Sequence, residues 1–374
     1  MNVSRGATVF GFDRLLRYVA PDFEWTTAAD CDLTRYDRCR DEFQMGRRGG
    51  GPVLTSEVDN FSVGANDAGC MSTTVEDNET KAQTPRSVFI FRFASTIVLW
   101  SVALLIVFSG YEIAFYALIG TVGLIALWEF YRMLDHQGLP NFKITAMICG
   151  GLMLVGSFYY FSRWGPARSY DFELAVLLFF LLTVFTRQMF ASLRGDEPLQ
   201  TMAYTLFGLL YVLWLYNFIT KIVYVTPRGP NGAVTGQFYV LYCIAITKFS
   251  DMGAYVTGSL IGRHTLVPHI SPKKTWEGFF GALLFSLLAS LGLYALMPEH
   301  LSVLTWTHAV VLGLLLGFAA VIGDLAESMI KRSTGVKDSG NMLPGIGGAL
   351  DLIDSLLFTA PLLFFYLRLV IRVP

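Results

Sequence analysis

GDLAESMIKRSTGVKDSGNMLPGIGGALDLID, residues Gly323–Asp354, stands between two long apolar segments, 303–323 and 350–371. A charged side chain at the centre of a membrane helix costs roughly 2.5 to 3.5 kcal/mol, so charges gathered at the ends of apolar segments indicate a functional site. The stretch holds five acidic and three basic side chains: Asp324, Glu327, Asp338, Asp351 and Asp354, with Lys331, Arg332 and Lys337.

The composition of the chain indicates an integral membrane protein. Of its 374 residues, 53% are hydrophobic and 15% are charged, whereas soluble domains carry about 25% charged residues. A net charge of −1 provides no basic field to attract a polyanion, so we expect no nucleic-acid partner. The five cysteines show no CxxC spacing, and we expect neither a disulfide framework nor a zinc site.

Apolar runs follow one another from Val88 to the C-terminus. Each approaches the roughly 20 residues that a helix needs to cross the bilayer core, and backbone groups in lipid must bond within their own segment. The predicted fold is therefore all-α and polytopic, with about nine transmembrane helices. The predicted spans are 88–109, 112–134, 143–162, 170–191, 199–224, 236–262, 277–297, 303–323 and 350–371.

The N-terminal segment differs from the rest of the chain. Residues 1–85 are polar and lack a sustained apolar period, which predicts a poorly ordered tail. The short apolar run Val9–Leu16 is interrupted by charges, so we do not expect it to act as a secretory signal. An equally weighted alternative is that the true start lies at Met45 or Met71. Residues 86–374 are predicted to form the membrane-embedded domain.

Basic residues gather in the loops that follow the even-numbered spans. By the positive-inside rule, this bias favours a cytoplasmic N-terminus. The loops after the sixth and eighth spans then face the same compartment. We expect an integral protein of the bacterial inner membrane whose active site faces the cytoplasm.

Among the charged residues inside the predicted spans are Lys248, Asp251, Glu129 and Arg187. Lys248 and Asp251 are three residues apart in span 236–262 and so share a helix face. They either form a self-neutralising pair, which still costs desolvation, or serve a function. Glu129 and Arg187 lie near span ends, where we expect them to reach the interface by snorkelling.

A basic loop precedes the seventh span. Ser271-Pro272 fixes a turn, and Thr275–Glu277 begins a helix whose free N–H groups and dipole suit a phosphate. Lys273 and Lys274 are placed to hold a triphosphate there. The alternative, given equal weight, is that the two lysines are topology signals or anionic-lipid contacts.

The acidic residues of the opening stretch occur in pairs. Asp324 and Glu327 are three residues apart at the end of span eight, and Asp351 and Asp354 repeat the spacing at the start of span nine. Hard oxygen ligands of this kind, with no His or Cys among them, suit Mg²⁺ that also holds substrate phosphates. A solvated acidic loop is the alternative.

Taken in order, these blocks resemble the phosphatidate cytidylyltransferase family, also called CDP-diacylglycerol synthases. The resemblance covers about residues 90–374. Two positions depart from the family pattern: Ile346 stands where the family usually has histidine, and Leu352 where it usually has arginine. The matching blocks are Asp251-x-x-Ala254-Tyr255, Ile270-Ser271-Pro272-Lys273-Lys274-Thr275-x-Glu277-Gly278, Gly323-Asp324-Leu325-x-Glu327-Ser328, and Ser328 to Asp354 with Lys331-Arg332, Lys337-Asp338 and Gly347-Gly348.

The resemblance implies a Mg²⁺-dependent reaction in which phosphatidate and CTP give CDP-diacylglycerol and pyrophosphate. It also implies a homodimer. The implied catalytic residues are Asp324, Lys331, Arg332, Lys337 and Asp338. The implied substrate-binding residues are Asp251, Ser271, Lys273, Lys274, Ser328, Gly347 and Gly348, and Asp251 would line an intramembrane cavity. The implied metal ligands are Asp324, Glu327, Asp338, Asp351 and Asp354.

Three other functions stay open at this point. A CTP-dependent transferase or kinase that acts on another lipid, such as a polyprenol, would carry similar motifs. A transporter would use the intramembrane residues Asp251 and Lys248, although transport needs polar groups with access to both faces. A degenerate family member would have only a structural or regulatory role.

Overall fold

The computed structural model describes residues 98, 100–191, 197–226, 235–336, 339–340 and 347–372. The predicted N-terminal tail lies outside the described residues. So do three positions singled out in the sequence, Lys337, Asp338 and Ile346.

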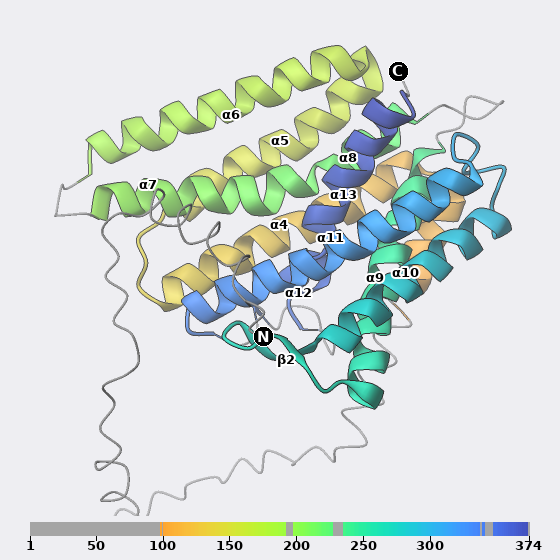
Figure 1. Cartoon of the computed structure of the whole chain (residues 1–374). Coiled ribbons are helices and arrows are strands. Elements are labelled where there is room, and N and C mark those ends of the chain that lie inside the picture. The colour runs from red at the N-terminus through yellow and green to blue at the C-terminus, as the bar shows by residue number, and fades with distance from the viewer. Residues whose placement is uncertain are drawn as a thin grey trace, which may run out of the picture. The chain divides into compact units, whose positions relative to one another are not determined.

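The described chain is mostly helical (Figure 1). Seven helical segments are long and apolar enough to cross a membrane, which confirms the all-α polytopic fold. Predicted span 236–262 is also a helix, but its polar residues keep it from meeting the same criterion. Trp100–Ser109 is a shorter apolar helix within the first predicted span. The elements are α4 (Glu112–His136), α5 (Lys143–Trp164), α6 (Pro166–Met189), α7 (Glu197–Gly208), η2 (Leu209–Trp214), α8 (Phe218–Val225), α9 (Gly236–Ile261), β1 (Thr265–Val267), β2 (Ser271–Thr275), α10 (Trp276–Leu296), α11 (Trp306–Ser333), α12 (Ala349–Ile353), α13 (Leu356–Phe365) and η3 (Tyr366–Val370).

One small antiparallel sheet interrupts the helices between α9 and α10. Strands β1 and β2 pair Thr265 with Thr275 and Val267 with Ser271. The Ser271-Pro272 segment, predicted as a turn, is thus the start of β2. The strand leads directly into α10, whose first amide, on Trp276, donates to the His264 carbonyl oxygen at 2.9 Å. The pairing sets the direction in which the basic residues of β2 approach the helices.

Helices α9, α10 and α11 pack closely through small residues. A Cβ on Gly253 of α9 would lie 2.6 Å from the Gly281 carbonyl oxygen of α10, and one on Gly317 of α11 would lie 2.8 Å from Ser286 Cβ. Small residues of this kind let membrane helices approach until their backbones touch. The close packing brings the acidic end of α11 beside the charged middle of α9.

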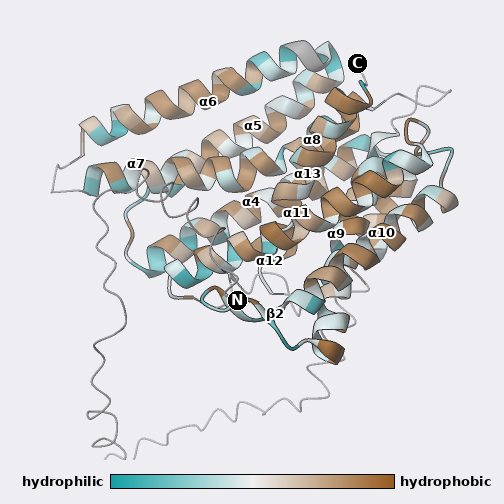
Figure 2. Cartoon of the chain, in the orientation of Figure 1, coloured by the Kyte–Doolittle hydropathy of each residue, from teal (hydrophilic) through white to brown (hydrophobic). Residues whose placement is uncertain are grey.

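The outer faces of the helices are apolar, as the brown colouring of Figure 2 shows. On α10, Phe280, Leu284 and Leu288 recur every four residues and are 63%, 52% and 58% exposed. Residues at this spacing form one stripe along a helix. Such a stripe is costly in water and suits contact with lipid tails.

Candidate active site

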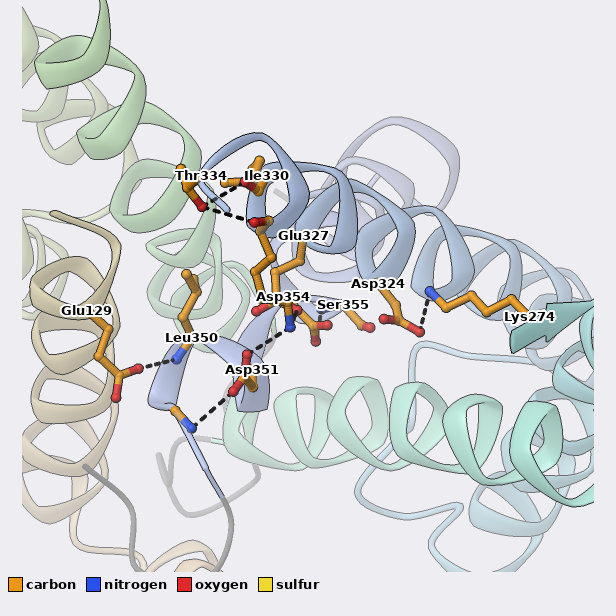
Figure 3. A network of polar contacts seen from close by, with 12 residues as sticks. Glu129, Lys274, Asp324, Glu327, Ile330, Thr334, Leu350, Asp351, Asp354 and Ser355 are labelled. Carbon is orange, nitrogen blue, oxygen red and sulfur yellow. Dashed lines mark hydrogen bonds and ion pairs between the residues drawn. The ribbon is translucent and has the colours of Figure 1, made fainter. Parts of the chain in front are cut away.

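Three carboxylates converge where α11 meets the end of α12 (Figure 3). Asp324 and Glu327 lie one turn apart on α11, and Asp354 follows α12. One carboxylate oxygen from each lies within 4.8 Å of the others. Glu327 and Asp354 are buried, with 1% and 6% exposure. The predicted common direction of Asp324 and Glu327 is confirmed, and the three oxygens match the donor set that Mg²⁺ prefers.

Lys331 neutralises part of this acidic group. Its Nζ lies 2.7 Å from Glu327 Oε2 and 3.0 Å from Asp351 Oδ1. The other Asp351 oxygen, Oδ2, accepts a hydrogen bond from the Gly348 amide at 3.1 Å. Gly347, the residue before Gly348, has a φ of 115°, a backbone conformation that favours glycine. The structure therefore places Asp351 at the start of α12 and beside Glu327, with which it shares Lys331.

Glu129 was missed as a site residue by the sequence analysis. The expected snorkelling is wrong, because Glu129 is fully buried near the end of α4. Its Oε2 accepts a hydrogen bond from the Leu350 amide in the first turn of α12 at 3.0 Å (Figure 3). A carboxylate at a helix N-terminus also interacts favourably with the helix dipole. The signal was available, since an ionisable residue inside an apolar run indicates function by default.

Arg187 makes different contacts from those of Glu129. Its Nη1 donates to Thr145 Oγ1 at 2.6 Å, and its guanidinium lies 4.4 Å from the centre of the Phe142 ring. Both contacts join the end of α6 to the start of α5. Arg187 thus ties two helices together away from the carboxylate group.

A polar cavity opens beside the carboxylates. It has an empty volume of about 850 Å³. Lys274 Nζ pairs with Asp324 Oδ2 at 2.6 Å, so Asp324 belongs to both the cavity and the carboxylate group. The middle of α9, the basic strand β2 and the acidic end of α11, each predicted as part of the site from a separate block of sequence, therefore meet at this cavity. The predicted residues that line the cavity are Asp251 from α9, Ser271, Lys273 and Lys274 from β2, and Asp324 from α11.

Lys248 and Asp251 form the ion pair that their spacing predicts. Lys248 Nζ lies 3.3 Å from Asp251 Oδ2, and the side chains are 26% and 36% exposed. Of the two, Asp251 lines the polar cavity, as expected, whereas Lys248 lines a separate apolar cavity. The ion pair therefore lies between the polar cavity and the apolar cavity.

The start of α10 is partly satisfied by the protein itself. Thr275 Oγ1 caps the helix by accepting from the Gly278 amide at 3.1 Å, so that N–H is not available to a phosphate. Glu277 accepts from the Arg263 and His264 amides at 3.2 and 3.3 Å, and its Oε1 lies 2.7 Å from His264 Nδ1. Glu277 thus anchors the loop after α9 to α10.

The remaining predicted site residues are not among those for which contacts are described above. Arg332 is exposed near the end of α11. Ser328 is half-buried and makes no hydrogen bond within the part of the chain that the structure describes. Lys337 and Asp338 lie outside the described residues, so their predicted roles stay predictions.

Comparison with known proteins shows the family of this chain. The sequence profile of the cytidylyltransferase family matches residues 90–370. The phosphatidate cytidylyltransferase of Bacillus subtilis (strain 168) is 32% identical over 262 residues, which cover 69% of this chain and 90% of that protein. The phosphatidate cytidylyltransferase of Staphylococcus epidermidis (strain RP62A) is 37% identical over 181 residues, which cover 48% of this chain and 62% of that protein.

A third relative is the uncharacterized protein YnbB of Escherichia coli (strain K12). It is 40% identical over 164 residues, which cover 44% of this chain and 50% of that protein. The alignments with the E. coli and S. epidermidis proteins thus span only 50% and 62% of those proteins, whereas the family profile spans most of this chain. This multi-pass membrane protein therefore belongs to the cytidylyltransferase family and is a nucleotidyltransferase.

Proposed function

We propose that this chain transfers the cytidylyl group of CTP to phosphatidate, giving CDP-diacylglycerol and pyrophosphate. One observation carries the proposal: Asp324 joins a cavity lined by lysines to a group of three carboxylates among lipid-facing helices. A lipid phosphate and a nucleotide triphosphate need such a place, where acyl chains stay in lipid and phosphates meet cations. The names of the B. subtilis and S. epidermidis relatives support this substrate pair.

The carboxylate group fits a divalent cation. Two unit negative charges no more than 4.8 Å apart repel by at least about 3.5 kcal/mol at an effective dielectric constant of about 20. Asp324 and Glu327 each have a lysine partner, whereas no lysine or arginine pairs with Asp354 among the described residues. We propose that Asp324, Glu327 and Asp354 hold Mg²⁺, with Asp338 and Asp351 close by. Bound Mg²⁺ would offset charge on the CTP phosphates.

The basic residues would bind the triphosphate. Lys273 and Lys274 line the polar cavity from β2, and Lys331 pairs with Glu327 of the carboxylate group. An oxygen of the lipid phosphate would attack the α-phosphorus of CTP while the bond to the β-phosphate breaks. Positioned cations then stabilise the charge that develops on pyrophosphate, as in phosphoryl transfer generally. No side-chain nucleophile is required. We propose the same phosphate-binding role for Arg332 and Lys337, with Ser328 and Gly347 nearby.

The charge distribution along the chain indicates which side of the membrane the site faces. We propose that the site faces the cytoplasm of a bacterial cell from the inner membrane, because the basic loops gather on that side. CTP would then reach the cavity from water, and phosphatidate would reach it from the bilayer. A homodimer is proposed from the family resemblance alone.

The test is an assay of the purified full chain in detergent with Mg²⁺, labelled CTP and either phosphatidate or a polyprenol. We expect labelled CDP-diacylglycerol from phosphatidate, and its loss in Asp354→Asn. Formation of a phosphorylated polyprenol and CDP would instead assign the chain to the lipid kinases. Absence of turnover with every lipid would overturn the proposal.

A further inference from the structure

We infer that the apolar cavity beside the active site holds one acyl chain of the lipid substrate. This inference rests on the proposed function. The cavity has an empty volume of about 870 Å³ and is lined by the helix Trp100–Ser109, by Tyr216 between η2 and α8, and by parts of α4, α8, α9, α12 and α13. Of the described residues that line it, Lys248 is the one that carries a charge. A cavity with this lining suits a hydrocarbon chain and would repel a polar ligand.

The apolar cavity adjoins the polar cavity at one point and the carboxylate group at another. Lys248 lines the apolar cavity, and its ion-pair partner Asp251 lines the polar cavity. On the other side, Leu352 and Ile353 line the apolar cavity and directly precede Asp354 of the carboxylate group. A ligand that fills both cavities must therefore be amphiphilic, with its phosphate beside Asp324 and its hydrocarbon beyond Lys248. A phospholipid with a terminal phosphate has this form.

The long axis of the apolar cavity follows the helices. Along α9, lining residues run from Val240 to Lys248, two turns or about 12 Å. Val240 and Phe115 lie near the first residues of α9 and α4, and Val107 lies near the end of the helix Trp100–Ser109. These three residues mark the end of the cavity remote from Lys248. An acyl chain that enters beside Lys248 would thus run along the helix axes, as acyl chains do in a bilayer.

The remote end is tied together by the protein. The Gln237 side-chain amide donates to the Val107 carbonyl oxygen at 2.6 Å, and Gln237 is 5% exposed. Next to it, the rings of Phe108 and Phe238 meet edge to face at 5.6 Å. These contacts join α9 to the helix Trp100–Ser109 beyond the cavity. The cavity therefore has a finite depth, and the length of the acyl chain becomes a basis for selection.

The first test narrows the cavity. Ala103 lines it, and Ala103→Trp should lower kcat/KM for dioleoyl phosphatidate about tenfold relative to dihexanoyl phosphatidate, with the KM for CTP unchanged. Leu105→Trp is the matched control, because Leu105 lies two residues away on the same helix and is 71% exposed. It should leave the ratio between the two lipids unchanged. An equal loss for both lipids in Ala103→Trp would overturn the inference.

The second test needs no turnover. Phosphatidate with a photoreactive diazirine in one acyl chain is crosslinked to the full chain in nanodiscs, and the labelled peptides are identified by mass spectrometry. We expect labelling around Ile244, which lines the cavity, and its loss with excess unlabelled phosphatidate but not with excess phosphatidylcholine. Labelling confined to the exposed stripe of α10, or equal competition by phosphatidylcholine, would overturn the inference. Cavity labelling without any CTP turnover would instead count against the proposed reaction alone.

Discussion

Two groups of buried charges lie within the helices, and they differ in balance. Between α6 and α8, Glu173 Oε2 meets Lys221 Nζ at 2.8 Å, and each side chain is 5% exposed. Between α11 and α12, three carboxylates approach one another to within 4.8 Å, and lysines pair with only two of them in the described residues. The first group is neutral by itself, whereas the second keeps an excess of negative charge.

The difference shows that burial alone does not identify a functional charge. Lys221 has its carboxylate and also lies 3.8 Å from the centre of the Phe218 ring, a favourable cation–π arrangement. Nothing further is required to stabilise it. Asp354 is similarly buried, at 6% exposure, but lies beside two other acids. The cost of such a group supports the proposal that a cation or a substrate completes it.

Removing one acid from the unbalanced group should have the largest effect. Asp324→Asn should lower kcat for CDP-diacylglycerol formation about a thousandfold, because loss of one preorganised electrostatic contact costs up to that much. Labelled-CTP turnover measures it, with Mg²⁺ varied at saturating lipid. Asp135→Asn is the control, since Asp135 pairs with Lys143 at a site where both side chains are 37% exposed. A similar loss in both variants would count against a special role for the carboxylate group.

Breaking the balanced pair should affect stability and leave chemistry intact. Lys221→Met leaves the Glu173 carboxylate buried without its cation, which should lower the free energy of unfolding by about 3 kcal/mol. The thermal midpoint of the detergent-purified protein measures the loss, and CTP turnover per folded molecule should stay at the wild-type level. The double variant Lys221→Met with Glu173→Leu should recover most of the midpoint. A drop in turnover without a drop in stability would assign this pair to function.

Glu129 offers an intermediate case, because it supports the site without belonging to the carboxylate group. Glu129→Ala removes the acceptor for the Leu350 amide and should lower activity about 10- to 100-fold, the usual cost of losing an outer-shell partner. The Mg²⁺ concentration for half-maximal activity should rise as α12 loosens. Glu129→Gln keeps an oxygen acceptor and should restore part of the activity. Equal effects of the two substitutions would show that charge, not the hydrogen bond, is what α12 requires.

The local parts of this structure were predictable from sequence. Bilayer thickness sets the length of the apolar runs, and the helical period puts Asp324 and Glu327 on one face. The Lys248–Asp251 pair follows from the same period. Each of these inferences needs only residues within one helix, and each is confirmed.

The parts that depend on tertiary contacts were not predictable. Nothing local connects Glu129 with Leu350, 221 residues later, so its role appears only when α4 and α12 meet. Asp351 and Asp354 have the same spacing as Asp324 and Glu327, but the two residues make different contacts. The helix α12 ends at Ile353. Asp351 reaches Glu327 through the shared Lys331, whereas Asp354 lies directly beside both Asp324 and Glu327. A period predicts a shared face only where the helix continues and one partner covers that face.

The exposed pair Lys143–Asp135 completes the comparison with the smallest expected effect. Its atoms lie 2.5 Å apart, closer than Lys221 and Glu173, yet water competes for both side chains. A double-mutant cycle with Lys143→Met and Asp135→Asn should give a coupling free energy of about 0.2 to 1 kcal/mol, the range for exposed ion pairs. The cycle is read from thermal midpoints at low and high salt, and the coupling should shrink as salt rises. A coupling as large as that of the Lys221–Glu173 pair would mean that distance, rather than burial and balance, ranks the charges of this protein.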